Sequence, residues 1–420
     1  MQRVKQLAAH LSGSSTGLTA LEVKRPDDVV ITMAIRSPLC KAKKGGFKDA
    51  RTDELMLQMF NKVIAHSGIE PEAIGDICVG TVLTSDPGYL ARAAMLAAGF
   101  PESVSVQIIN RFCSSGLMAV TTVANQVRSG QIEIGLAIGI ENMSENPDKG
   151  GPSFSELISC NAAARDCQQR MGWTSENVAV EFSVTREEQD AFAAESFKRA
   201  EEAQKRGYFE KEIVPFTVLQ KTPGSDSRVP VVVKEDDGIR YGTTQEKLSK
   251  IKSAFPQWGN GTTTGGNASQ ITDGAAAVLV MTRREAERRG LPILAKHVTT
   301  AVAGCPPRIM GIGPVFAIPL ALKNAGLEMK DVDLFEINEA FASQCVYCAK
   351  ELQIPMDKSM SHFRCNLKAR RLIFQGYPRC TGARQIVTGL NELRRRQGKV
   401  LLTSMCIGTG MGAAGIFLRE

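Results

Sequence analysis

The sequence lacks the features that mark membrane, fibrous and nucleic-acid-binding proteins. No apolar stretch among its 420 residues approaches the ~18 residues that a membrane-spanning helix needs. Aromatic residues make up only 6% of the chain, whereas nucleic-acid binders interleave aromatics with a broad basic face. Hydrophobic residues at 43% and charged residues at 23% are ordinary globular values, which exclude a disordered or collagen-like chain. At roughly 150 residues per domain, the length predicts two or three domains.

The sequence also lacks a secretory signal peptide and paired metal-binding motifs. Its eleven cysteines are scattered, which indicates reduced thiols in an intracellular compartment. Cys345-Val-Tyr-Cys348 has redox or metal spacing, but it lies in a helical pattern and no second pair exists. We therefore interpret Cys345 and Cys348 as buried small residues and expect no structural metal.

The net charge is small and comes from two short segments. The 51 lysines and arginines exceed the 44 acidic residues by seven. Arg3 and Lys5 supply two of the seven, and the rest lie in residues 359–379, as Arg364, Lys368, Arg370, Arg371 and Arg379. The body of the chain is neutral, so the sequence predicts no nucleic-acid partner.

The first of these segments has a regular pattern. Arg3-Val4, five residues and His10-Leu11 resemble an N-terminal peroxisomal address, and residues 2–11 can form a short amphipathic helix. The alternative is a frayed terminus. A flexible linker is expected over residues 13–19.

Buried-strand patterns alternate with helical patterns, which predicts a layered α/β fold. The expected strands are 28–33, 76–82, 104–109, 134–140, one that begins at Gly274, 335–337 and 400–405. The expected helices are 53–65, 90–98, 113–129, 185–206, 340–352 and 381–396.

The predicted domains follow from a change of composition. Residues 146–265 are polar and have few strand patterns, so we interpret them as an inserted loop domain, or lid. Residues 1–27 form the targeting segment and linker, residues 28–145 plus 266–282 an N-terminal half, and residues 283–420 a C-terminal half. Each half contains a Cys-Ser-Ser-Gly or Cys-Thr-Gly sequence, a helix, a glycine and a strand, in that order, which an internal duplication explains.

Two cysteines lie at junctions where chemistry is expected. Cys113 follows a strand and precedes a helix, and the positive end of a helix favours a thiolate. The alternative is a buried core cysteine. Cys406 ends a strand and begins Cys406-Ile-Gly408-Thr-Gly410-Met-Gly412. Gly410 to Gly415 formally match a dinucleotide fingerprint, but too few residues follow to build the required unit, so we interpret the stretch as a loop at a strand end.

Together, Asn110–Gly116, Asn338–Phe341 and Ser404–Gly412 resemble the signatures of the thiolase family, in particular its peroxisomal 3-ketoacyl-CoA branch. Further matches are Gly45-Gly-Phe-Lys-Asp49, Gly75–Gly80, Met171–Asn177, Gly266–Gln270 and Met310–Pro314. The resemblance covers about residues 28 to 358 and resumes at Cys380. It implies two duplicated α/β halves in a layered αβαβα arrangement with an inserted lid, a homodimer, and a peroxisomal location reached through an import receptor that reads residues 3–11.

The resemblance also implies a reaction and its residues. Cys113 would attack the keto carbon of a 3-ketoacyl-CoA, and Cys406 would exchange protons with the acetyl-CoA enolate and with incoming CoA. The backbone N–H groups of Cys113 and Gly408 would form one oxyanion hole, and Asn338 would contribute to another. Ser269 and Met310 would contact the substrate. Coenzyme A enters as a substrate, and no cofactor or metal is implied.

One expected residue is missing. The family has a histidine in a Gly-His-Pro sequence shortly before the Cys-Thr-Gly motif, but residues 359–379 hold an unrelated, longer segment. Tyr377 lies near the expected place and His362 lies further upstream, and neither is expected to replace the imidazole. Either this segment derives from a retained intron or a wrong reading frame, or the protein is an impaired enzyme with at least a hundredfold loss of thiolysis, since ~10²–10³ is the effect of losing one oxyanion donor.

Two other functions remain open. A ketosynthase or hydroxymethylglutaryl-CoA synthase would share the fold, but these lack a second catalytic cysteine after the last strand, and Cys406 argues against them. A non-catalytic subunit that binds CoA esters would explain the missing histidine.

Overall fold

The computed structural model describes residues 17–225, 227–354 and 381–420. The elements before the lid, with the strand that follows it, are α2 (Leu18–Leu21), β1 (Val29–Arg36), β2 (Cys40–Lys41), α3 (Thr52–Ser67), η1 (Pro71–Ala73), β3 (Asp76–Gly80), α4 (Pro87–Ala97), β4 (Ser105–Ile109), α5 (Ser115–Arg128), β5 (Ile134–Glu141) and β8 (Thr272–Thr282). The lid contains α6 (Glu156–Ser159), α7 (Ala162–Asp166), α8 (Met171–Glu181), α9 (Arg186–Lys205), β6 (Phe216–Lys221), β7 (Arg228–Val233), α10 (Gln245–Ser249) and η2 (Pro256–Trp258). The remaining elements are α11 (Arg283–Arg288), β9 (Ala295–Gly304), η3 (Pro307–Ile312), α12 (Gly313–Ala325), η4 (Met329–Asp331), β10 (Leu334–Ile337), α13 (Ala342–Glu351), α14 (Thr381–Arg395), β11 (Val400–Ile407) and β12 (Met411–Arg419).

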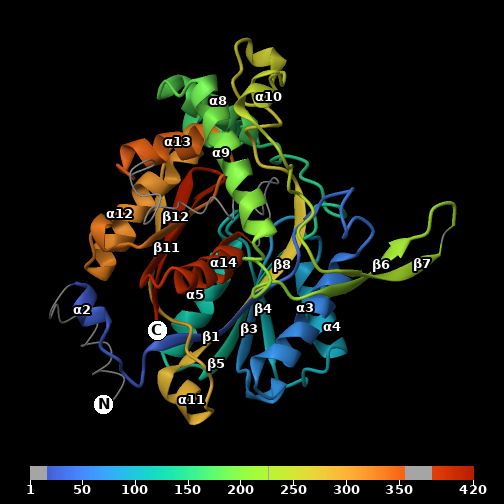
Figure 1. The fold of residues 1–420 in the computed structure, drawn as a ribbon, viewed down its shortest axis with the longest axis vertical. Coiled ribbons are helices and arrows are strands. Elements are labelled where there is room, and N and C mark those ends of the chain that lie inside the picture. The colour runs from blue at the N-terminus through green and yellow to red at the C-terminus, as the bar shows by residue number, and fades with distance from the viewer. Residues whose placement is uncertain (1–16, 226, 355–380) are drawn as a thin grey trace.

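The described strands form one large sheet in the order β10-β11-β12-β9-β1-β8-β5-β3-β4, with β2 paired to β8, and β6 and β7 form a separate two-stranded sheet. The pairing of β1 with β9 is narrow, because it joins only Val30 to Lys296 and Ile31 to Ala295. The parts of the sheet on either side of this junction lie on opposite sides of α5 and α14, while α12 and α13 cover one outer face and α3 and α4 the other (Figure 1). The layers therefore run helix, sheet, helix, sheet, helix, as predicted.

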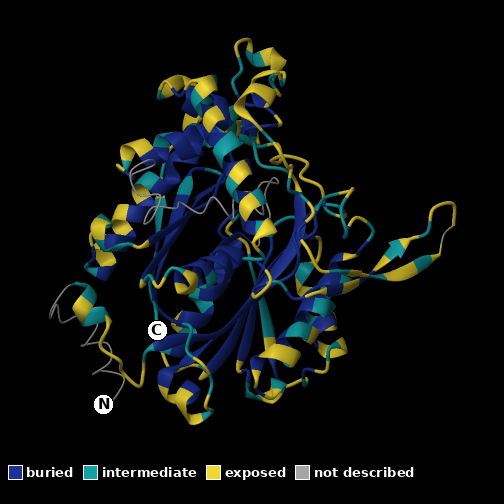
Figure 2. Ribbon diagram, in the orientation of Figure 1, coloured by how far each residue is buried: buried dark blue, intermediate teal, exposed yellow. Residues whose placement is uncertain are grey.

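Three apolar cores fill the space between these layers. One joins α3 and α4 to the sheet through residues such as Phe60 and Ile77, and a second joins α12 to β10–β12 through residues such as Ile318 and Leu402. The third lies around α5 and α14, which are buried on both sides and form the dark centre of Figure 2. Helix α14 is almost wholly buried although it carries polar residues such as Arg384 and Gln385, because the two parts of the sheet enclose it from both sides.

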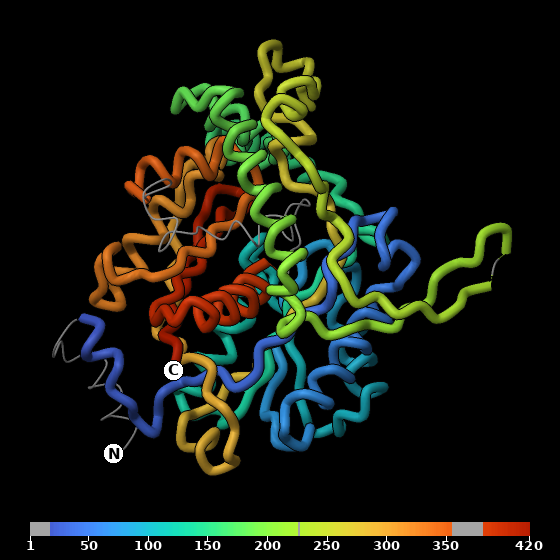
Figure 3. The backbone as a smooth tube through the Cα atoms, viewed as in Figure 1, coloured from blue at the N-terminus to red at the C-terminus, as the bar shows by residue number. Residues whose placement is uncertain are grey.

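The lid leaves the sheet at the end of β5 and returns at β8, and these two strands are antiparallel neighbours with Glu141 opposite Gly274. Helices α8 and α10 lie at the top of the view, α9 runs from there toward the centre, and the β6–β7 ribbon projects to one side (Figure 1 and Figure 3). Arg36 of β1 fastens the lid to the body. Its guanidinium is fully buried and donates to Glu212 at 2.7 Å and to both oxygens of Asp236 at 2.8 and 3.0 Å.

The predicted elements that lie in the described residues are present, with ends shifted by a few residues, whereas the short helix considered for residues 2–11 lies outside them. Some elements were missed, and two sequence interpretations were wrong. Strands β9 and β12 and helix α12 had not been predicted. The stretch from Gly410 to Gly415 is not a loop, since only residues 408–410 turn and β12 begins at Met411. The linker expected to reach Thr19 is interrupted by α2, whose Leu18 and Leu21 pack against the outer core beside α12.

Among the described residues, no helix combines the length and hydrophobicity that crossing a bilayer requires. The described residues also contain no group of three histidine, cysteine, aspartate or glutamate side chains that could hold a metal ion.

His297 gives the fold a pH dependence that can be tested. It lies buried on β9, where Nδ1 accepts from Arg128 at 3.1 Å and Nε2 contacts the Thr300 hydroxyl at 3.0 Å. Burial, and then the charge of Arg128, lower the pKa of His297 from 6.5 to about 3. As the pH falls, the unfolded chain therefore binds this proton first, so the contribution of His297 to stability is complete above pH 6.5 and declines toward pH 3.

We expect a His297→Gln variant to lose this part of the pH dependence. Below about pH 6, the difference in free energy of unfolding between wild type and variant should shrink by about 1.4 kcal/mol per pH unit. Urea unfolding of both proteins at several pH values between about 7.5 and 5 measures this difference, which removes the effect of other titrating groups. A difference that stays constant with pH would contradict a neutral, buried imidazole.

Candidate active site

Cys113 lies in a tight turn between β4 and α5, two residues before the first helical residue. The residue before it, Phe112, has a positive φ of 45°, a conformation that non-glycine residues adopt at a cost of about 1–3 kcal/mol. Ser115 holds this turn, because its hydroxyl donates to the Phe112 carbonyl at 2.7 Å and accepts from the Arg111 N–H at 3.0 Å. The turn therefore fixes a buried thiol at the start of the central helix.

Cys406 lies at the end of β11, beside the end of the parallel strand β10. The ladder between these strands ends with Ile337 opposite Ser404, and Asn338 follows directly. Asn338 Oδ1 accepts from the Cys406 N–H at 3.0 Å, and Asn338 Nδ2 lies 3.5 Å from Cys406 Sγ, to which it donates. The carboxamide of Asn338 thus contacts Cys406 through both of its polar atoms.

The turn that contains Cys113 lies close to Gly408, which follows Cys406 by two residues. A Cβ at Gly408 would lie 3.5 Å from the ring of Phe112 and 3.1 Å from Cε of Met171. The charge of Cys113 also acts on the Cys406 thiol. The structure therefore brings together Cys113, Asn338 and the Cys406–Gly408 segment, which are three separate parts of the sequence.

The environment of Cys406 favours its neutral thiol. Burial, and then the charge of Cys113, raise the pKa of Cys406 well above its usual value, and the hydrogen bond from Asn338 opposes them. This differs from the near-neutral acidity expected from the resemblance, because the thiol is fully buried and burial disfavours a charge. A neutral thiol is the protonation state that a proton donor needs.

Asn338 is itself held by helix α13. Gln344 Nε2 donates to the Asn338 carbonyl at 2.9 Å, and the Cys345 thiol donates to the same carbonyl at 3.4 Å. Cys348 is also buried, and its thiol donates to the Gly311 carbonyl at 3.6 Å. Cys345 and Cys348 are thus buried small residues, as we interpreted them.

The lid covers this group from the opposite side. Met310 of η3, Ala340 and Phe341 pack with Cys406 in one apolar cluster, together with Met171 of the lid and Ala268, which follows the lid. Ser269 lies next to Ala268, and its N–H donates to the Ala340 carbonyl at 3.0 Å. Ser269 and Met310 therefore lie around the same cysteine, whose surroundings on this side are apolar and exclude water.

Neither histidine in the described part of the chain reaches this group. His66 is at the exposed end of α3 and bonds the Lys62 carbonyl, and His297 bonds Arg128 and Thr300. The remaining histidines, His10 and His362, lie outside the described residues, as does Tyr377. The imidazole that the family uses thus has no counterpart in the described residues of the site.

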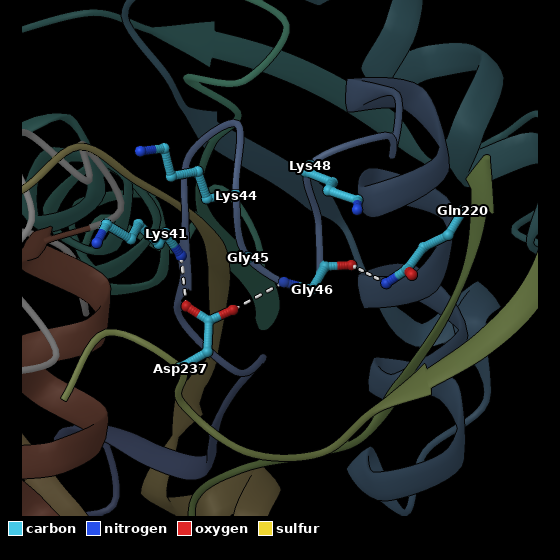
Figure 4. A pocket seen from close by; sticks show the side chains of 7 residues that line it. All are labelled: Lys41, Lys44, Gly45, Gly46, Lys48, Gln220 and Asp237. Carbon is cyan, nitrogen blue, oxygen red and sulfur yellow. Dashed lines mark hydrogen bonds between the residues drawn. The ribbon is translucent and has the colours of Figure 1, made fainter. Parts of the chain in front are cut away.

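A cavity of about 310 Å³ lies elsewhere, between the loop that follows β2 and the lid (Figure 4). It is lined by Lys41, Lys44, Gly45, Gly46, Lys48, Gln220 and Asp237. The loop wraps the Asp237 carboxylate, which accepts from the N–H groups of Lys41 at 2.6 Å and Gly46 at 2.7 Å. None of the predicted site residues lines this cavity, so we interpret it as part of the lid's anchorage.

Sequence reasoning missed one titratable neighbour of the site. Cys305 follows β9, its N–H donates to the Gly410 carbonyl at 2.9 Å, and its charge acts on the Cys406 thiol. Burial raises the pKa of Cys305 to about 11, so it too is a neutral thiol. No spacing in the sequence indicates this position, because β9 itself had not been predicted.

Comparisons with known proteins agree with this geometry. The model of the thiolase N-terminal domain matches residues 29–284, and that of the thiolase C-terminal domain matches residues 291–419. The peroxisomal 3-ketoacyl-CoA thiolase of Yarrowia lipolytica is 48% identical over 427 residues, which cover 100% of both chains.

Two solved structures are similar over nearly the whole chain. The dimeric peroxisomal thiolase of Saccharomyces cerevisiae has a TM-score of 0.87 and 42% identity, and covers 96% of this chain and 100% of its own. A second structure of the peroxisomal 3-ketoacyl-CoA thiolase of that organism has a TM-score of 0.75 and 38% identity, covering 95% and 100%. It is described as a five-layered α-β-α-β-α structure built from two core domains of identical topology, which confirms the predicted fold.

Proposed function

The chain belongs to the thiolase family, and on this premise we propose that it is a peroxisomal 3-ketoacyl-CoA thiolase. The proposed reaction is the cleavage of a 3-ketoacyl-CoA by coenzyme A, which gives acetyl-CoA and an acyl-CoA shortened by two carbons, in fatty-acid β-oxidation. The observation that carries the proposal is the meeting of two buried thiols, Cys113 and Cys406, with Asn338 bonded to the second.

The first half of the reaction forms an acyl-enzyme. The Cys113 thiolate attacks the keto carbon of the substrate, and the bond between this carbon and the α-carbon breaks, so its electron pair passes to the enolate of acetyl-CoA. The Cys406 thiol gives its proton to that enolate carbon and becomes a thiolate. Its raised pKa keeps the proton in place until the enolate forms.

The second half releases the product. The Cys406 thiolate takes the proton of the incoming CoA thiol, whose sulfur then attacks the carbonyl carbon of acyl-Cys113 and displaces the Cys113 thiolate. Negative charge develops on the substrate oxygen in both halves and requires fixed donors. We assign the N–H groups of Cys113 and Gly408 to one such oxygen and Asn338 to the other. Ser269 and Met310 are placed to line the substrate's path, and CoA is consumed rather than held as a cofactor.

The proposed location and assembly rest on relatives and on sequence. The Y. lipolytica and S. cerevisiae relatives are peroxisomal, and Arg3 to Leu11 fit an address read by an import receptor. The S. cerevisiae relative is dimeric. Strand β4 ends the sheet order in the described residues, which leaves one edge for a second copy beside the Cys113 turn.

Trapping of the acyl-enzyme tests the proposal. Incubation with acetoacetyl-CoA in the absence of free CoA is expected to acetylate Cys113, and mass spectrometry of the peptide that contains it measures the label. A Cys113→Ala variant should lose the label, whereas Cys78→Ala, which removes another buried thiol, should retain it. Binding of the CoA ester without any acylation of wild-type Cys113 would refute the proposal.

That refuting result would support a second function. The absence of the family histidine favours a non-catalytic subunit that binds CoA esters. Such a protein would bind acetoacetyl-CoA in a calorimetric titration but would leave every cysteine unmodified.

A further inference from the structure

The first turn of α14 crosses the ends of the two strands that carry Asn338 and Cys406. Gln385, in this turn, is fully buried. Its Nε2 donates to the Glu336 carbonyl at 2.8 Å and to the Ser404 carbonyl at 3.1 Å. Glu336 lies two residues before Asn338, and Ser404 lies two residues before Cys406. A single side chain therefore joins the backbones of both strands just ahead of the site.

The bridge made by Gln385 lies at the end of the β10–β11 ladder. The β10–β11 ladder ends at Ile337 and Ser404. Beyond it, the Asn338 N–H donates to the same Ser404 carbonyl at 2.9 Å, and the Asn338 carboxamide contacts Cys406. The spacing of the strand ends thus determines whether that carboxamide reaches both polar atoms of Cys406.

Helix α14 is a rigid support for this link. Gly382 approaches α5 so closely that a Cβ there would lie 2.2 Å from the Leu117 nitrogen, which fixes the start of α14 against the helix that follows Cys113. Arg384, next to Gln385, forms a buried ion pair with the Glu336 carboxylate at 3.5 Å. These contacts fix the position of α14, and so they fix the point from which the Gln385 side chain reaches the two strands.

We propose that Gln385 is a positioning residue, which bridges the Glu336 and Ser404 carbonyls and so holds Asn338 in hydrogen-bond contact with Cys406. The proposal deepens the proposed function, since Cys406 is the proton-transferring thiol of that reaction. Loss of the bridge would let the strand ends separate and would weaken the contact between Asn338 Nδ2 and Cys406 Sγ. A donor at that sulfur favours the thiolate, so the acidity of Cys406 reports the position of Asn338.

The decisive experiment measures the alkylation of Cys406 by iodoacetamide as a function of pH, with peptide mass spectrometry, because this readout does not require thiolase activity. In Gln385→Met, which keeps the volume but removes the donor, the alkylation profile is expected to move up by about one pH unit. Cys113 and Cys305, the titratable groups that act on the Cys406 thiol, are the same in every variant. Thr388→Val removes another buried hydrogen bond of α14, to Glu212 at 2.9 Å, and should leave the profile unchanged.

A double variant separates positioning from a general effect on the fold. If Gln385 acts through Asn338, then adding Gln385→Met to Asn338→Ala should produce no further shift. An unchanged profile in Gln385→Met, or a shift that adds fully to that of Asn338→Ala, would overturn the proposal. If Gln385→Met does not fold, Gln385→Asn replaces it, because its carboxamide is one methylene shorter and so loses the bridge between the two carbonyls, and it should give the same upward shift.

Steady-state kinetics distinguish a failure of this inference from a failure of the proposed function. Where thiolysis is measurable, Gln385→Met should lower kcat by about tenfold and leave KM within about twofold, because a misplaced proton donor affects chemistry more than binding. A kcat unchanged by Gln385→Met would count against the inference. Absence of thiolysis in the wild type would count against the proposed function alone, since the alkylation profiles would still decide the role of Gln385.

Discussion

Replacement of residues 359–379 by a glycine-rich segment that places Gly-His-Pro before the Cys-Thr-Gly motif is expected to raise kcat for thiolysis at least about a hundredfold. The family resemblance implies that this histidine contributes to the second oxyanion hole and helps to keep the nucleophilic cysteine ionised. The described residues offer no substitute, because His66 and His297 bond Lys62, Arg128 and Thr300, away from the cysteines. The two cysteines and Asn338 already lie together in the described part of the chain, so the missing imidazole should limit the rate.

The control is the same replacement segment with glutamine in place of the histidine. It restores the length and glycine content of the loop without an imidazole, and it should give no more than about a tenth of the gain. Normal turnover by the unmodified 420-residue chain would contradict the prediction. A transcript read across codons 350–385 decides the origin of the segment, since recovery of a Gly-His-Pro loop there would show that residues 359–379 come from a retained intron or a shifted frame.

Removal of the guanidinium that fastens the lid should have the largest effect on stability. Arg36→Met leaves Glu212 and Asp236 buried without their cation, and loss of one partner of a buried ion pair destabilises a protein by about 3–5 kcal/mol. Burial raises the pKa of Glu212 even beside Arg36. Without Arg36 this pKa should rise further, so the loss of stability is greatest at high pH and shrinks as the pH falls and the carboxylate is protonated.

Urea unfolding followed by circular dichroism measures this loss. Lys250→Met is the matched control, because it breaks an ion pair with Glu246 in the lid whose side chains are 72% and 80% exposed, and such pairs contribute less than about 1 kcal/mol. The triple variant Arg36→Met, Glu212→Gln, Asp236→Asn should recover much of the stability, because it leaves no buried charge uncompensated. A loss in Arg36→Met no larger than in Lys250→Met would refute the role of the buried pair.

The sequence predicted the layered fold because buried strands such as β1 and β5 are continuous apolar runs. The sequence did not predict β12, because a stretch that contains several glycines is typical of a loop. Gly412 lies within that strand because α12 approaches it closely, and a Cβ there would lie 2.1 Å from the Gly313 carbonyl. Here a glycine marks close packing rather than a turn, and only the tertiary structure distinguishes the two.

The site was predicted residue by residue, but only through resemblance to a family. Spacing alone favours Cys113 and Cys406 separately. The contact of Asn338 with Cys406 depends on the strand order, which places β10 beside β11. The approach of the Cys113 turn depends on tertiary packing, which places Phe112 beside Gly408. Cys305 and Gln385 had no signal in the sequence, because their roles come from contacts between segments far apart in the chain.

The adjacency of β5 and β8 has a kinetic consequence. The two strands lie about 5 Å apart, yet the whole lid separates Glu141 from Gly274 along the chain. Closing so long a loop is slow, but its entropic cost grows only with the logarithm of the loop's length. The β5–β8 pair should therefore form late in folding, whereas insertions in exposed loops of the lid, which leave the Arg36 anchorage intact, should change the stability of the sheet very little.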